Sequence, residues 1–176
     1  LGLEQVASGG VPFIVPDVLN SGKVPAAARG DVATILPWVL HERFGDLGVV
    51  RAQYPSMKAW VDQLLAIAGE RHLWEGGFQF GDWVDPDAPS DHPSKAKTDA
   101  DLVASAYLYK SARVLAEAAE LLGESADSAR YASAAQKVRG AWLAEYVTPA
   151  GRILSDAQTA YALAIEFGIA DGELAQ

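Results

Sequence analysis

Apolar residues recur at helical spacing along most of this chain of 176 residues, and this repeat limits its fold more than any other feature. Met57, Trp60, Val61, Leu64 and Leu65 follow the i, i+3, i+4 pattern of an amphipathic helix. The sequence lacks a convincing stretch of the two-residue alternation that is typical of half-buried strands. It therefore predicts an all-α domain.

Turn and cap residues divide this pattern into separate helices. We expect the first long helix to begin at Asp31, with Pro37 in its first turn, where a missing N–H costs little. The next helix should start near Pro55, because "FGDLGVV" interrupts the apolar stripe, and it should end near Gly69.

Three further helices are expected in the second half of the chain. Thr98 is the predicted N-cap of a long helix, with Asp101 at the capping-box position and Gly123 as the stop. Ser125 and Ser155 are the predicted caps of the two helices that follow.

Two connections are much longer than the median of about 4–6 residues, one over residues 10–30 and one over residues 76–98. The second belongs to the stretch "GGFQFGDWVDPDAPSDHPSKAKTDAD", which gathers three aromatic residues, one His and six Asp. Disordered segments are poor in Trp and Phe, so this composition favours a functional loop.

Composition excludes several classes of partner. The net charge is −9 and the 14 basic residues are scattered, so we expect neither nucleic acid nor an anionic membrane surface to bind. No apolar run approaches the roughly 18 residues of a membrane span. The chain has no cysteine, which excludes disulfides, thiolate zinc sites and a cysteine nucleophile.

Motifs for metal, cofactor or serine chemistry are missing. The three histidines, His41, His72 and His92, are not accompanied by a GxSxG motif. The acidic loop lacks the spacing of a calcium loop and the chain lacks HExxH, so we expect no metal and no cofactor. The loop side chains that could have served as ligands are Asp82, Asp85, Asp87, Asp91 and His92.

The pairing of Trp83 with Asp82 suggests carbohydrate binding. An indole offers a flat apolar platform for the C–H face of a sugar, and a carboxylate accepts hydrogen bonds from its hydroxyls. The local alternative is that Trp83 packs into a core and Asp82 caps a turn. The remaining tryptophans lie in or next to helical stripes and are expected in the core: Trp38, Trp60, Trp74 and Trp142.

Several segments resemble the catalytic domain of bacterial α-L-rhamnosidases over essentially the whole chain. They are "GGVPFIVPDVL", "GDVATILPWVLHERFGD", "YPSMKAWVD", "GGFQFGDWVDPDAP", "KTDADLVASAYLYKSARVLAEAA" and "YVTPAGRILSDAQTAYALAIEFGI". The resemblance implies an all-α fold that is part of an (α/α)6 toroid of the six-hairpin glycosidase type, roughly half of the barrel. It also implies metal-independent, inverting hydrolysis of terminal α-L-rhamnosides.

The same resemblance implies substrate contacts. Trp83 matches a family tryptophan that lines the rhamnose pocket, and Asp82 is its neighbour. The family usually has Trp-Gly-Asp where this chain has Arg29-Gly30-Asp31, so an arginine replaces an apolar platform and adds a charge. Asp31 is a third expected substrate contact, although the simpler interpretation is a helix N-cap, a role that contributes about 1 kcal/mol.

The resemblance assigns no catalytic residue to this chain. The family's general acid lies in a motif upstream of "GGVPFIVPD", and its general base lies beyond Gln176. Residues 1–176 are therefore expected to form a partial catalytic domain that is inactive alone. Helices without their neighbours should expose apolar faces, which predicts self-association.

Two alternatives remain at this point. Residues 98–122 and 126–146 are Ala-rich and similarly spaced, as in a non-enzymatic helical-repeat interaction module, but no signature recurs with a period near 34. The other alternative is a different (α/α)6 carbohydrate-active enzyme, since a fold does not determine a function.

Overall fold

The computed structural model describes residues 2–19, 24–83, 85–93 and 95–170, and within these ranges its regular elements are helices joined by loops. The five α-helices are α1 (Val32–Phe44), α2 (Leu47–Ala68), α3 (Ala100–Leu122), α4 (Ser125–Tyr146) and α5 (Gln158–Glu166). Short 3-10 turns lie at Gly2–Glu4 (η1) and Gly69–Arg71 (η2). Among the described residues, β pairing is limited to an isolated antiparallel bridge between Val147 and Ile153. The all-α prediction is confirmed.

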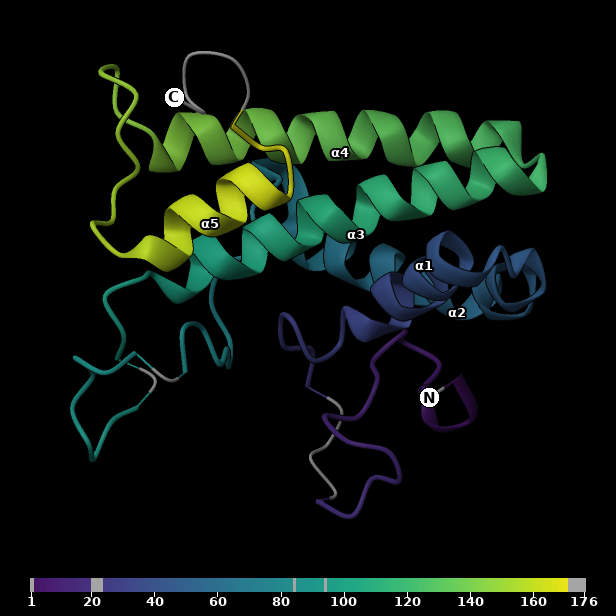
Figure 1. Cartoon of the computed structure of the whole chain (residues 1–176), viewed down its shortest axis with the longest axis horizontal. Helices are drawn as coiled ribbons and strands as arrows, with labels where there is room; N and C mark the ends of the chain where they lie inside the picture. The colour runs from purple at the N-terminus through teal and green to yellow at the C-terminus, as the bar shows by residue number, and fades with distance from the viewer. Residues whose placement is uncertain (1, 20–23, 84, 94, 171–176) are drawn as a thin grey trace.

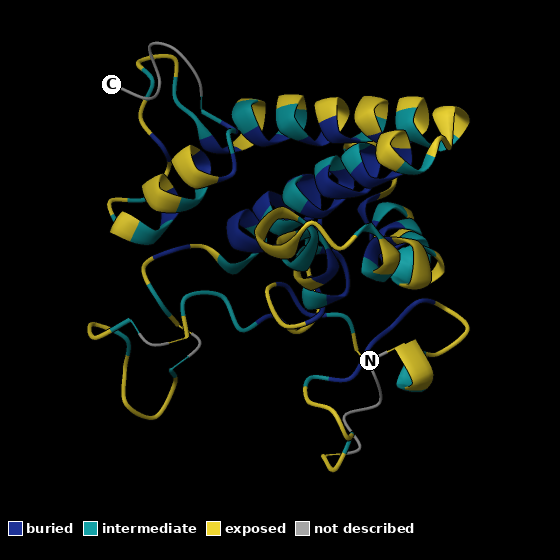
Figure 2. Ribbon diagram, turned by 45° about the vertical axis from the view of Figure 1, so that its right-hand side comes forward, coloured by how far each residue is buried: buried dark blue, intermediate teal, exposed yellow. Residues whose placement is uncertain are grey.

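Helix α3 is the centre of the arrangement. It packs against α1, α2, α4 and α5 (Figure 1). Most of its apolar residues are buried, and Figure 2 shows α3 as the most continuously buried helix. Because small alanines alternate with Leu, Val and Tyr around its circumference, neighbouring helices can approach it on several sides. Among the described helices, none combines the length and apolar character needed to cross a membrane.

The ends of α3 follow from a side-chain cap and a glycine. The carboxylate of Asp99 accepts hydrogen bonds from the backbone N–H groups of Asp101 and Leu102. Gly123 ends the helix at φ +81°, in the left-handed region that favours glycine. The predicted stop is confirmed, but the predicted cap is wrong by one residue: Asp99 caps the helix, and Thr98 is left free for another contact.

The expected start of the second helix near Pro55 is wrong. Gly45 ends α1 in the left-handed conformation, and the carboxylate of Asp46 then caps α2 by accepting from the N–H of Val49 at 3.2 Å. This two-residue link lets α2 begin at Leu47, so Pro55 lies inside the helix. Pro37 is also inside its helix, beyond the first turn.

The last two predicted caps differ from the structure as well. Helix α4 begins at Ser125 itself, after Glu124, without a side-chain cap. Helix α5 begins at Gln158, two residues later than a cap at Ser155 would place it. The hydroxyl of Ser155 instead accepts a hydrogen bond from the N–H of Ala157 in the preceding turn.

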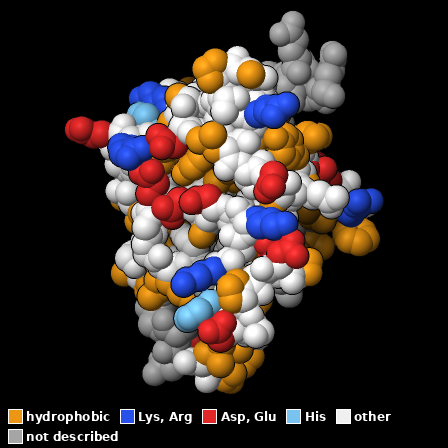
Figure 3. Space-filling view, turned by 90° about the vertical axis from the view of Figure 1, so that its left-hand side faces the viewer, with side chains coloured by type: hydrophobic (Ala, Val, Ile, Leu, Met, Phe, Trp, Pro, Cys, Tyr) orange, Lys and Arg blue, Asp and Glu red, His pale blue; other side chains and the backbone are white. Residues whose placement is uncertain are grey.

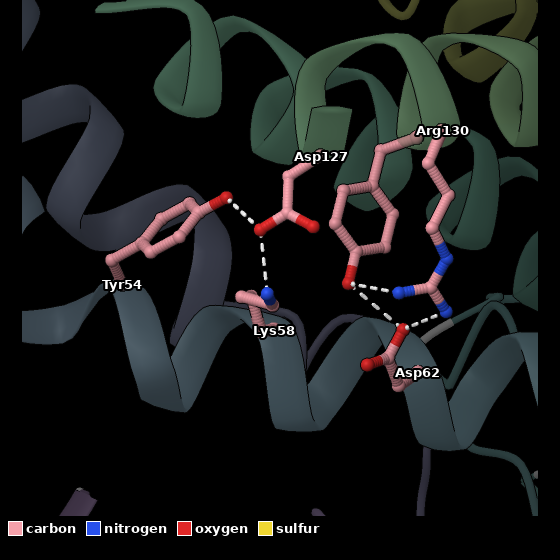
Figure 4. Close-up of polar contacts among 6 residues, drawn as sticks. Tyr54, Lys58, Asp62, Asp127 and Arg130 are labelled. Atoms are coloured by element: carbon pink, nitrogen blue, oxygen red, sulfur yellow. Dashed lines mark hydrogen bonds and ion pairs between the residues drawn. The ribbon is translucent and has the colours of Figure 1, made fainter. Parts of the chain in front are cut away.

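A polar seam joins α2 to α4 (Figure 4). Asp127 accepts hydrogen bonds from Tyr54 and Lys58, which lie one helical turn apart on α2. One turn further along, Asp62 accepts from Arg130 and Tyr131 of α4. The seam fixes the position of the hairpin of α3 and α4 relative to α2.

The two long loops leave the helices on the same side of the molecule (Figures 1 and 2). The first loop enters α1 through Gly30, which is pressed against the buried indole of Trp60. A Cβ atom at residue 30 would lie 2.0 Å from Cη2 of Trp60. Only glycine therefore fits at the junction of this loop with the helices.

We expect Gly30→Ala to lower the free energy of unfolding by about 3 kcal/mol, the upper part of the usual range for overpacking, because the enclosed indole has no room to move. Gly140→Ala is the matched control, since its added Cβ meets nothing within 4 Å. That change should stabilise α4 by about 1 kcal/mol. Urea unfolding measures both, and similar effects at the two positions would contradict the tight contact.

Candidate functional site

The two long loops are joined to each other. The side-chain Oε1 of Gln79 accepts a hydrogen bond from the N–H of Ala27 at 2.8 Å, and this contact is buried. The Phe13 ring lies 6.0 Å from the Phe78 ring and 5.1 Å from the Phe80 ring, measured between centroids. Segments that are distant in the sequence therefore form one structure. We call it the loop corner, and it comprises Phe13, Arg29, Phe78, Phe80 and Trp83.

Trp83 presents an apolar surface to solvent at this corner. Its indole meets the Phe80 ring edge to face, with centroids 5.2 Å apart. The residue is 40% exposed, whereas Trp60, Trp74 and Trp142 are at most 1% exposed. The core location expected for those three is confirmed, whereas Trp38 is only partly buried and packs against the core. The alternative that Trp83 is a core residue is wrong.

Arg29 stacks on the same aromatic group. The guanidinium carbon Cζ lies 4.3 Å from the centroid of the Phe80 ring, a distance typical of a cation–π contact. Arg29 is exposed, so its N–H groups reach solvent. Arg29 therefore packs on an aromatic surface of the second loop.

Asp82 connects the second loop to the start of α5. Its Oδ2 accepts a hydrogen bond from the hydroxyl of Thr159 at 2.5 Å and a longer one from Thr98 at 3.5 Å. In the described part of the chain, Oδ1 has no hydrogen-bond partner. Asp82 also borders a pocket of about 320 Å³, which is lined by Asp82, Asp85, Pro86, Asp87, Lys97, Asp156, Ala157, Gln158 and Thr159. One carboxylate oxygen is anchored and the other is free to accept from a ligand.

Asp31 is fully buried, and its side chain does not cap α1. Oδ1 accepts hydrogen bonds from Nε1 of Trp60 at 3.0 Å and from the hydroxyl of Ser111 at 2.6 Å. Oδ2 accepts from the N–H of Ala28 at 2.9 Å. The predicted N-cap position is confirmed but the side-chain cap is absent, because the carboxylate instead joins the first loop to α2 and α3.

Burial and hydrogen bonding shift the pKa of Asp31 in opposite directions. Burial raises the pKa of Asp31, because a carboxylate loses its hydration in the interior, and the donors from Ser111, Trp60 and Ala28 offset part of that rise. All three donors are satisfied by this one side chain. Asp31 is therefore a structural support of the loop corner.

Asp85 and Asp87 make their contacts within the acidic loop itself. Asp85 accepts hydrogen bonds from the N–H groups of Lys97 and Asp87, and these contacts keep the pKa of Asp85 below its usual value. Asp87 pairs with the ammonium group of Lys97. Among the described residues, no group of three acidic, His or Cys side chains is arranged to hold a metal ion.

Of the predicted substrate contacts, the structure places Trp83 and Asp82 side by side on the second loop. Asp31 lies beneath the corner, two residues from Arg29 in the chain, and has no exposed surface. Sequence reasoning missed the phenylalanines and Gln79, which join the loops. The run "GGFQF" carried the signal, because it alternates aromatic and amide side chains between glycines and the acidic segment.

Comparison with known proteins identifies relatives over the whole chain. The family model for the bacterial alpha-L-rhamnosidase 6 hairpin glycosidase domain matches residues 1–176. An alpha-L-rhamnosidase of Formosa agariphila is 34% identical over 174 residues, which are 97% of this chain and 18% of that protein. An alpha-L-rhamnosidase of Streptomyces avermitilis is 31% identical over 168 residues, 94% of this chain and 15% of that protein.

Solved structures agree with these matches. The native α-L-rhamnosidase of Aspergillus terreus superimposes with a TM-score of 0.88 at 32% identity, over 96% of this chain and 20% of that one. The Streptomyces avermitilis enzyme in complex with L-rhamnose gives a TM-score of 0.81 at 28% identity, over 97% of this chain and 15% of that one. The helices therefore match part of a six-hairpin toroid, and the chain spans a fifth or less of these relatives.

We expect Asp31→Ala to lower the free energy of unfolding by about 3 kcal/mol, because it leaves buried donors unpaired at about 1–3 kcal/mol each. Asp31→Asn keeps the Oδ1 acceptor and should lose less. The control is Asp46→Ala, which removes an exposed helix cap and should cost about 1 kcal/mol. Urea unfolding compares the three variants, and a loss for Asp31→Ala no larger than for the control would refute the supporting role.

Proposed function

Because the chain belongs to the bacterial α-L-rhamnosidase six-hairpin glycosidase family, we propose that it is one segment of a larger glycoside hydrolase. This hydrolase cleaves terminal α-L-rhamnosides, and residues 1–176 supply one arc of its (α/α)6 toroid. The match along the whole chain supports this proposal over a helical-repeat module and over other (α/α)6 enzymes.

The proposed reaction proceeds with inversion at the anomeric carbon. One carboxylic acid protonates the leaving oxygen, and a second carboxylate, about 6.5–9.5 Å away, activates water on the opposite face of the sugar. Both groups belong to other segments of the hydrolase in this proposal. The arc described here binds and orients the sugar, and it is inactive alone.

In the proposed complex, Trp83 and Asp82 contact the sugar. The exposed indole covers the apolar face of the rhamnose, on the side of its C6 methyl group, and excludes water from it. The free Oδ1 of Asp82 accepts a hydrogen bond from a sugar hydroxyl, while Thr159 holds Oδ2 in place. Direct contact by Asp31 stays a prediction, and its fully buried carboxylate favours a role in support of Arg29 and Gly30.

One observation carries the proposal most strongly. Trp83 is the tryptophan of this chain that is both exposed and mounted on a loop, and the anchored Asp82 stands next to it. An isolated exposed indole needs no functional explanation. An indole held by an aromatic cluster beside an anchored acceptor has the composition of a sugar site.

In the complete hydrolase, Trp83→Ala should lower kcat/KM for an aryl α-L-rhamnoside by about 10-fold or more, as expected when an apolar platform that contributes on the order of 1.5 kcal/mol is lost. Trp83→Phe keeps a smaller platform and should lose less. Steady-state kinetics measures both variants, and thermal unfolding shows whether each remains folded.

The isolated chain provides the complementary measurement. It should give no turnover of the same substrate, since its proposed role includes neither catalytic carboxyl group. Turnover by the isolated chain would refute this assignment of roles. An inactive complete hydrolase would refute the proposed function. An unchanged kcat/KM in Trp83→Ala would refute the proposed contact.

We also propose that the isolated chain self-associates through apolar helix faces. Leu36 and Phe44 of α1 are 49% and 79% exposed, and Ile165 of α5 is 57% exposed. On the face that Figure 3 shows, apolar side chains lie at several separate places between charged side chains. Next to Leu36, a groove of about 230 Å³ is lined by Val32, Ala33, Leu36, Pro37, Leu40, Val49 and Gln53. Other helices of the toroid would cover such faces, and a second copy can cover them in their absence.

Sedimentation velocity should therefore show dimers or larger species of the isolated chain at concentrations of tens of micromolar. The double change Leu36→Gln and Phe44→Gln should shift the distribution toward the monomer, because it makes the α1 face polar. Leu154→Gln is the control, since Leu154 is 60% exposed but lies in the turn between α4 and α5. A wild-type chain that stays monomeric would overturn this proposal.

A further inference from the structure

Gln79 is a buried amide that ties one long loop to the other. Its Oε1 accepts a hydrogen bond from the backbone N–H of Ala27 at 2.8 Å, and only 8% of the residue is exposed. Phe78 and Phe80, its two neighbours in the sequence, place their rings 4.9 Å apart between centroids, and both are more exposed than Gln79. Alternate residues of this segment thus serve the hydrogen bond and the aromatic cluster.

The hydrogen bond of Gln79 reaches a strained turn. Ala28 follows Ala27 and has a φ of +66°, in the left-handed region that residues other than glycine rarely adopt. Gln79 holds this turn at the N–H of Ala27, and Asp31 holds it at the N–H of Ala28, at 2.9 Å. A backbone conformation of this kind persists only where its surroundings fix it. The two side chains together provide that fixation.

The turn and Gln79 both act on the ring that supports Trp83. Arg29, directly after Ala28, lies with its guanidinium carbon 4.3 Å from the centroid of the Phe80 ring. Gln79 directly precedes Phe80 in the chain. The Phe80 ring in turn meets the indole of Trp83, with centroids 5.2 Å apart. A shift of the two loops relative to each other would therefore move the exposed indole.

The amide of Gln79 is not the most stable choice for a buried position. Its Nε2 has no hydrogen-bond partner in the described part of the chain. A buried donor without an acceptor is unfavourable, and an apolar side chain of the same length would avoid that penalty. Among the described residues, the polar contact that Gln79 makes is the one with Ala27. This contact therefore gives the amide its purpose, which is to hold the turn.

We propose that Gln79 is a positioning residue for sugar binding and that it acts through the turn at Ala28. By holding the two loops together, it keeps the indole of Trp83 and the free oxygen of Asp82 in the geometry that fits a rhamnose. The proposal rests on the proposed function, and it adds to that function a residue that does not touch the sugar. Sugar binding should consequently depend on Gln79 more strongly than stability does.

The test uses the complete hydrolase, with L-rhamnose as the probe in isothermal titration calorimetry and an aryl α-L-rhamnoside in steady-state kinetics. Gln79→Met keeps the length of the side chain and removes the acceptor. It should weaken the binding of L-rhamnose by about 10-fold, as expected for the loss of one buried hydrogen bond. KM should rise with little change in kcat. The melting temperature should change little, since an unpaired N–H of Ala27 replaces the unpaired Nε2 of Gln79.

Two further variants separate positioning from a general loss of structure. Gln79→Glu, measured at about pH 5, where burial keeps the new carboxyl group protonated and neutral, retains an acceptor for Ala27 and should restore most of the binding. Tyr131→Phe is the control, since it removes the hydrogen bond to Asp62 in the seam between α2 and α4. This control should lower the melting temperature more than Gln79→Met does, and it should leave L-rhamnose binding and KM unchanged.

A matched pair of variants at Ala28 tests the turn itself, because the side chain of Ala28 is exposed. Ala28→Gly keeps the left-handed conformation accessible and should leave L-rhamnose binding within about twofold of the wild type. Ala28→Val opposes that conformation, since a β-branched residue is disfavoured at positive φ, and should weaken binding about as much as Gln79→Met. The double variant of Gln79→Met and Ala28→Val should lose less than the sum of the two, because both act on one turn.

Failure of the inference is distinguishable from failure of the proposed function. Unchanged L-rhamnose binding in Gln79→Met, or no binding by the wild-type hydrolase, would overturn the role of Gln79. Weaker binding in Gln79→Met without a loss in Ala28→Val would also overturn it, because the amide would then act without the turn. Absence of rhamnoside turnover by the wild-type hydrolase would refute the proposed function, while L-rhamnose binding would still decide the inference.

Discussion

The buried carboxylate of Asp31 is the interaction on which the loop corner depends. It accepts hydrogen bonds from the first loop, from Trp60 of α2 and from Ser111 of α3. Moving a carboxylate out of water is unfavourable unless donors replace the lost hydration, and here three donors do so. These hydrogen bonds fix the backbone that leads into α1, with Gly30 against Trp60 and Arg29 at the surface.

The surface of the corner is built on this fixed entry. Gln79 binds Ala27 across the two loops, and the rings of Phe13, Phe78 and Phe80 pack together above them. Binding groups on loops are effective when rigid elements position those loops. In this protein α2 and α3 provide the rigid elements. The aromatic cluster packs between the loops and holds the exposed side chains in place.

The sequence predicted the helical class and the glycine-terminated C-terminal ends of helices correctly, because apolar spacing and glycine stops act locally. Gly69 and Gly123 end their helices as expected. The start of α2 was missed, since Asp46 caps that helix and Pro55 is tolerated inside it. The site was predicted only in part: Asp82 and Trp83 are adjacent in the chain, but the partners of Asp31 lie 29 and 80 residues away. Local patterns carry no information about such contacts.

The central claim is that the loop corner, supported by Asp31, faces the sugar. A crystal structure of the complete hydrolase with an L-rhamnoside bound tests it most directly. The account predicts that the sugar lies against the indole of Trp83, within reach of the free oxygen of Asp82, while Asp31 stays bound to Trp60 and Ser111. A sugar bound away from this corner, or a first loop detached from α2 and α3, would contradict the account.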